Sequence, residues 1–103
     1  MRQVIKGLVY NTETAEILGS ADSSYLGAND FRSYSETLFK TKKGRFFLAG
    51  EGGPMTKWGE ACGDMRGFGS GIIPLDSAEA REWCEFNDID IEVISEHFDL
   101  EDA

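Results

Sequence analysis

The chain has 103 residues, 41% of them apolar, and a formal net charge of −9. This length predicts a single domain over residues 1–103 with one modest core, and it excludes a two-domain enzyme. No apolar run reaches the roughly 18 to 20 residues of a membrane span and no long apolar stretch marks a secretion signal, so we expect a cytoplasmic protein without a membrane partner.

The N-terminal third is rich in residues that favour strands and turns. Val4 to Tyr10 predicts a first strand that stops at the turn pair Asn11-Thr12. The short segment Thr14 to Gly19 is expected to pair back on it as a hairpin, although it also begins like a helix. Ser20 to Asp30 is crowded with Ser, Asp, Asn and Gly and predicts a loop.

The strongest local pattern is a hairpin in the middle of the chain. Glu36 to Thr41 and Arg45 to Ala49 are two β-type runs, and Gly44 between them supplies the positive φ that a tight turn needs. The turn is basic and has aromatic neighbours, a combination that can bind nucleic acid. An ordinary solvated hairpin tip is the simpler interpretation, because the overall charge of the domain opposes nucleic-acid binding.

A glycine-rich region follows this hairpin. Eight of the twelve glycines lie between Gly50 and Gly71, which predicts loops with one turn of helix around Thr56 to Ala61. Ile72, Ile73 and Leu75 then suggest a short strand that Pro74 ends.

The C-terminal part predicts two helices. Asp76 and Glu79 fit a capping box, and a helix from there to about Asn87 buries one face and exposes an acidic one. Phe86 lies nearer the acidic face and is expected to pack on the next element or on a partner. The segment Ile89 to Phe98 has both strand-like and helix-like spacing, and we favour a second helix capped by Asp88 or Asp90. The expected fold class is α+β, a small antiparallel β-sheet with a hairpin and an acidic C-terminal helical pair.

The sequence offers little for catalysis or cofactors. The segment AGEGGPMT is not followed by the GK[ST] of a P-loop, and Gly67 to Gly71 is not a dinucleotide fingerprint. Cys62 and Cys84 are expected to remain reduced thiols, and His97 to be a solvated histidine. These three residues are too scattered to ligate a metal ion. We therefore expect no catalytic residues, no metal and no cofactor.

The negative charge is concentrated at the C-terminal end. Residues 1–75 carry +1, whereas residues 76–103 carry −10, with Arg81 as the only basic residue. This field repels nucleic acid and favours basic protein surfaces that hold phosphates. Its simplest interpretation is a solvated helix face that aids solubility, and its functional interpretation is a surface that imitates DNA. The candidate partner-binding residues are Asp76, Glu79, Glu82, Glu85, Phe86, Asp88, Asp90, Glu92 and Glu96.

Three segments carry a resemblance to known proteins, namely Tyr10 to Gly19, Glu36 to Glu60 and Ile72 to Glu85. Together they resemble a family of small acidic proteins of phages and plasmids, some of which are similar to anti-CRISPR proteins. The resemblance implies binding and steric exclusion, with no catalytic residues.

The expected function is therefore a non-enzymatic inhibitor of a host CRISPR effector complex, in a bacterial host cell, that occupies the DNA-binding groove with its acidic surface. The alternative is an acidic antitoxin or immunity protein that neutralises a basic toxin. A third hypothesis is a small enzyme that acts through Cys84 or Cys62.

Overall fold

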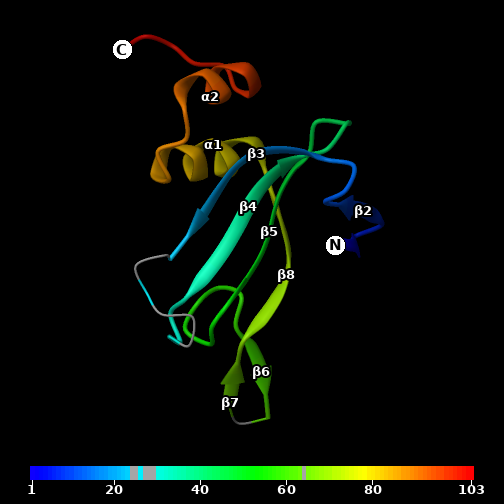
Figure 1. Ribbon diagram of the computed structural model, residues 1–103. Coiled ribbons are helices and arrows are strands. Elements are labelled where there is room, and N and C mark those ends of the chain that lie inside the picture. Colours follow the sequence, from blue (N-terminus) through cyan, green and yellow to red (C-terminus); the bar gives the residue numbers. More distant parts are fainter. Residues whose placement is uncertain (24–25, 27–29, 64) are drawn as a thin grey trace.

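A four-stranded antiparallel sheet in the order β3-β4-β5-β8 forms the centre of the computed structural model, which describes residues 1–23, 26, 30–63 and 65–103 (Figure 1). Its strands are β3 (Glu16–Asp22), β4 (Tyr34–Lys40), β5 (Phe46–Gly52) and β8 (Gly69–Leu75). Two small hairpins accompany it, β1 (Arg2–Ile5) with β2 (Leu8–Asn11) and β6 (Glu60–Cys62) with β7 (Met65–Gly67). The chain continues into helices α1 (Ser77–Phe86) and α2 (Ile91–His97). The predicted α+β class is confirmed.

The predicted central hairpin is confirmed as β4 and β5. Their ladder runs from Lys40 opposite Phe46 to Tyr34 opposite Gly52, so both strands are longer than expected. Gly44 in the turn has a φ of 88°, a value that costs glycine little because it has no Cβ.

The N-terminal expectations need correction. Residues Val4 to Tyr10 are two strands, because Lys6 and Gly7 have φ values of 51° and 78° and reverse the chain between β1 and β2. Two consecutive positive φ values are typical of a type I′ hairpin turn. The next strand, β3, pairs with β4 instead of returning to the first strand. The predicted loop Ser20–Asp30 begins later, since β3 continues to Asp22, and residues 24, 25 and 27–29 of it lie outside the described part of the chain.

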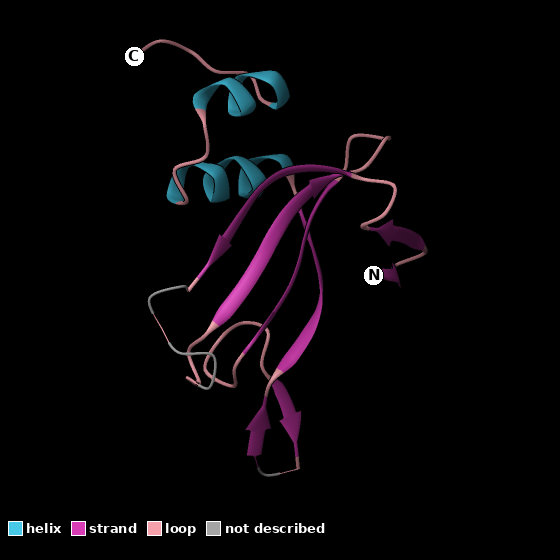
Figure 2. Cartoon of the chain, viewed as in Figure 1, coloured by secondary structure: helices cyan, strands magenta, loops and turns pink. Residues whose placement is uncertain are grey.

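The helices and the N-terminal hairpin lie on opposite sides of the sheet (Figure 2). The two faces of the sheet carry separate cores. Leu38 and Phe39 are neighbours on β4, yet Leu38 packs under the helices and Phe39 packs under the N-terminal hairpin, because side chains alternate along a strand. The helix-facing core consists of Leu18, Leu38, Phe46, Leu48, Trp58, Ala80, Trp83, Cys84, Ile94 and Phe98. The hairpin-facing core consists of Tyr10, Phe39, Phe47 and Ile72.

The glycine-rich region is more regular than predicted. Residues 50–52 extend β5, residues 60–62 and 65–67 form the paired strands β6 and β7, and β8 begins at Gly69. The helical turn expected over Thr56 to Ala61 is absent from the structure, where residues 54–58 form turns and β6 starts at Glu60. Pro74 does not end the last strand, because β8 lies at the sheet edge, where a proline is tolerated.

Both predicted helices are confirmed. At the start of α1, the Asp76 carboxylate accepts the Glu79 backbone N–H at 2.8 Å, and the Glu79 carboxylate accepts the Asp76 backbone N–H at 2.9 Å. Asp90 caps α2 by accepting the Glu92 backbone N–H at 2.9 Å. Within the described ranges, no helix is long and apolar enough to cross a membrane.

Candidate functional site

All nine predicted partner-binding residues are exposed. On α1, Ala80, Trp83 and Cys84 are buried, and the outer face carries Glu82 and Glu85. Phe86 is 85% exposed, so it does not pack on the next element. A large aromatic side chain thus lies in water on the same helix as several carboxylates.

Helix α2 extends the acidic surface. Ile94 and Phe98 pack into the helix-facing core, and Glu92 and Glu96, four residues apart, share the outer side. Some predicted residues also have structural roles, since Asp76, Glu79 and Asp90 form helix caps. Asp88 adopts a φ of 53° in the link between the helices, a left-handed conformation that Asp tolerates better than most residues do.

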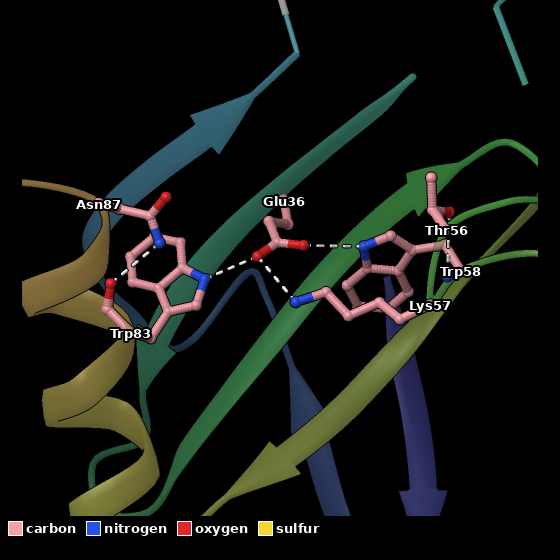
Figure 3. A network of polar contacts seen from close by, with 6 residues as sticks. All are labelled: Glu36, Thr56, Lys57, Trp58, Trp83 and Asn87. Atoms are coloured by element: carbon pink, nitrogen blue, oxygen red, sulfur yellow. Dashed lines mark hydrogen bonds and ion pairs between the residues drawn. The ribbon is translucent and has the colours of Figure 1, made fainter. Parts of the chain in front are cut away.

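A buried carboxylate lies beside this surface, under the C-terminal half of α1 (Figure 3). Glu36, on β4, is only 4% exposed. Its Oε1 accepts the indole N–H of Trp58 at 3.0 Å, and its Oε2 accepts the indole N–H of Trp83 at 2.6 Å. The Lys57 ammonium lies 3.0 Å from Oε2 and supplies a positive charge. The chain's two tryptophans, one from a loop and one from α1, therefore meet at one carboxylate.

The glycines of the sheet make room for this network. A Cβ on Gly50 would lie 2.8 Å from the Trp58 ring and 2.8 Å from the Glu36 Cβ, so only glycine lets the indole lie on the strand. The loop that carries Trp58 is built from turns, in which Thr56 Oγ1 donates to the Gly53 carbonyl at 2.8 Å and accepts the Trp58 backbone N–H at 3.2 Å.

The β6–β7 hairpin anchors this loop from the other side. The Arg66 guanidinium donates to the carbonyls of Pro54 and Gly59, each at 3.0 Å. These two carbonyls flank the segment that contains Lys57 and Trp58. The glycine-rich region thus serves to position one indole and one ammonium group against Glu36.

A pocket of 360 Å³ opens above this network. Two exposed apolar side chains lie at its rim, Phe86 at 85% and Met55 at 71% exposure. Its remaining lining consists of Arg32, Tyr34, Glu36, Thr56, Lys57, Trp58, Trp83 and Asn87.

The predicted site did not include Glu36, Lys57, Trp58 or Trp83. One sequence pattern pointed to the site. Glu36 stands two residues before Leu38 in a strand, so both side chains lie on the face that carries the core, where the structure buries the carboxylate. A buried charge requires hydrogen-bond donors, and the two tryptophans are donors that bury readily.

Cys84 is poorly suited to act as a nucleophile. Cys84 is a free, fully buried thiol, and its pKa is raised, mainly by burial and further by the neighbouring Glu85 carboxylate, which disfavours the reactive thiolate. The side chain of Cys62 lies outside what the structure describes.

His97 is not the solvated side chain that the sequence predicted. Its side chain is 10% exposed, because α2 packs it against the sheet. The Lys40 ammonium lies 3.3 Å from Nδ1, and a Glu16 carboxylate oxygen lies 3.5 Å from Nε2. His97 therefore links α2 to β3 and β4. Among the described residues, no three Asp, Glu, His or Cys side chains gather closely enough to hold a metal ion.

No protein-family model matches this chain, and no curated protein or solved structure matches it either.

Proposed function

We propose that this protein is a non-enzymatic inhibitor that occupies the DNA-binding groove of a CRISPR effector complex with the acidic surface of its C-terminal helices. The observation that carries the proposal is the position of Phe86, 85% exposed on a helix whose outer face is acidic. An exposed aromatic anchor surrounded by polar groups is typical of a protein interface. Among the large apolar side chains that the structure describes, Phe86 is the most exposed.

The charge pattern of the helices supports a basic partner. Carboxylates three residues apart on a helix are separated by about 4.5 Å along its axis, whereas duplex DNA presents one charge per about 1.7 Å over both strands. One helix is therefore too sparse to imitate a duplex, and the second acidic helix raises the charge density. Both helices are capped and share one core, which holds their carboxylates in place.

The sequence resemblance to small mobile-element proteins directs the choice of target to CRISPR effector complexes. A basic toxin is the alternative partner, because its surface would be attracted by the same charges.

A competition assay tests the proposal. Purified CRISPR effector complexes of several types are mixed with labelled target duplex, with and without this protein, at low and moderate salt. We expect loss of duplex binding by one type, weakened as salt rises, because salt screens the attraction between exposed charges.

A pair of charge-reversal variants makes the assay specific. The double variant Glu82→Lys and Glu85→Lys removes charge from α1, and the control Glu13→Lys and Glu51→Lys makes the same charge change at exposed positions outside the helices. Only the first should lose inhibition. Equal inhibition by both variants would contradict the mechanism, and no effect on any complex would favour the toxin partner, which rescue of toxin-expressing cells would then identify.

A further inference from the structure

The pocket above Glu36 has the chemistry of a cation site. We propose that it binds the guanidinium group of an arginine side chain on the basic partner, an inference that rests on the proposed function for its biological occupant. The floor, the walls and the position of the pocket each support this assignment.

The floor is a buried carboxylate that is paired with a half-exposed ammonium. The indoles of Trp58 and Trp83 donate hydrogen bonds to Glu36 but carry no charge. In the described part of the chain, Lys57 supplies the cation on this carboxylate, and its side chain is 47% exposed. Oε1 accepts one hydrogen bond, and a carboxylate oxygen has room for a second.

The walls are aromatic. Trp58, Trp83, Tyr34 and Phe86 all line the pocket. Aromatic faces attract cations, and arginine in particular stacks its planar guanidinium on them.

Lys57 of the chain itself already places a cation against the carboxylate and one aromatic wall of this pocket. Its ammonium lies 3.0 Å from Glu36 Oε2 and 5.9 Å from the centre of a Trp58 ring. The Lys57 side chain is 47% exposed, so its ammonium can move into water when a guanidinium takes its place, and the exchange leaves the buried carboxylate paired with a cation. A guanidinium would then form a forked pair with the carboxylate, which a lysine cannot do.

An anionic ligand fits the pocket poorly. The Arg32 guanidinium at the rim is bound to Asp30 at 3.1 Å, and the Lys57 ammonium is bound to Glu36. Both positive groups therefore have carboxylate partners, and the Glu36 carboxylate would repel a second anion.

The pocket lies where a basic partner would reach it. Phe86 belongs both to its rim and to the helix that carries Glu82 and Glu85. A basic surface bound to the outer face of α1 would thus place its side chains next to the pocket mouth.

The test is a titration of the whole protein with N-acetyl-arginine amide, followed through the indole N–H signals of the two tryptophans by NMR. The neutral analogue N-acetyl-citrulline amide has nearly the same shape and serves as the ligand control. We expect both indole signals to shift with the arginine compound at millimolar concentration and to stay in place with citrulline.

Three variants distinguish binding in the pocket from binding elsewhere on the surface. Phe86→Ala should weaken binding about fivefold by removing one wall, and Lys57→Met should tighten it about tenfold by removing the competing cation while keeping an apolar stem. Phe31→Ala, which removes an aromatic ring that is 60% exposed and does not line this pocket, should leave binding unchanged. If Lys57→Met does not fold, the other two variants still decide.

Unmoved indole signals, or equal shifts with citrulline, would overturn the arginine site. This failure is distinct from failure of the proposed function, because the titration uses the free protein and the competition assay uses the effector complex. If the protein binds arginine but the Glu82 and Glu85 reversal variant still inhibits duplex binding, the arginine site stands and the electrostatic mechanism of inhibition is contradicted.

Discussion

The two faces of the central sheet are covered in different ways. The N-terminal hairpin covers one face with apolar contacts, in which the Phe47 ring stacks on Phe39 and meets Tyr10 edge-on. The helices and the glycine-rich loop cover the other face, where Glu36 lies among apolar side chains and is bonded to two indoles. Apolar packing depends mainly on area and shape, whereas a buried carboxylate is satisfied only when every donor is in place. The helix-facing side is therefore the one whose geometry is specified closely enough for recognition.

The largest expected effect on stability comes from a substitution in the hairpin-facing core, which should leave the helix-facing side unchanged. Phe47→Ala should lower the free energy of unfolding by about 3 to 5 kcal/mol, because Phe47 is fully buried and its loss leaves a cavity. Urea unfolding measures the loss, and the indole N–H signals should stay nearly unchanged because the ring lies on the opposite face. Val9→Ala on β2, in the N-terminal hairpin that covers this face, is the control: Val9 is 60% exposed and the expected change is below about 0.5 kcal/mol. Large movement of both indole signals in Phe47→Ala would show that the faces are not independent.

Glu36→Gln probes the polar face. The amide retains one oxygen acceptor and replaces the other with an NH₂ group, so one indole N–H loses its acceptor and Lys57 loses its ion pair. The expected loss is about 1 to 3 kcal/mol in urea unfolding, with displaced indole signals. Glu51→Gln, an exposed carboxylate on the adjacent strand, is the control. A neutral effect of Glu36→Gln would mean that the carboxylate contributes no net stability.

Two glycines that face each other across β5 and β8 provide a matched pair. Gly50 and Gly71 are direct ladder partners, but a Cβ on Gly50 would lie 2.8 Å from the Trp58 ring, whereas a Cβ on Gly71 meets nothing within 4 Å. Gly50→Ala should cost about 1 to 3 kcal/mol and shift the Trp58 indole signal. Gly71→Ala should leave that signal in place and be neutral or stabilising by up to about 1 kcal/mol in thermal unfolding. Equal effects of the two would remove the close-approach argument.

The smallest expected effect is on the stability of the N-terminal end of α1. Asp76→Ala removes one half of the capping box and should cost about 1 kcal/mol. Ser77→Ala, at the exposed next position, is the control. Hydrogen exchange should quicken at the Glu79 amide more than at amides of the N-terminal hairpin. The same exchange rates in the variant and the natural protein would contradict the role of the cap.

The parts of the fold that could be predicted from sequence are those that local physics determines. The β4–β5 hairpin depends on a glycine turn between two short runs, and α1 depends on the Asp76–Glu79 capping box. The residues of each signal lie within a few positions of one another in the sequence, so the signal can be recognised without knowing the rest of the chain.

The missed features depend on contacts between distant residues. The pairing of β3 with β4 could not be read from Thr14 to Gly19, because strand propensity does not specify a partner. Trp83 and Glu36 are 47 positions apart, and Trp58 reaches Glu36 over 22. The acidic surface could be placed on helices from its spacing, whereas the pocket beside it needed the tertiary structure.

The outer strands of the sheet have a consequence for behaviour at high concentration. In β3 the ladder register slips between Ile17 and Gly19, and in β8 Pro74 has no N–H to offer. A bulge and a proline are two devices that keep open sheet edges from adding strands of another molecule. The sheet is therefore protected at both edges against growth into fibrils, and the outer surfaces of the helices and loops that cover its faces are left for specific partners.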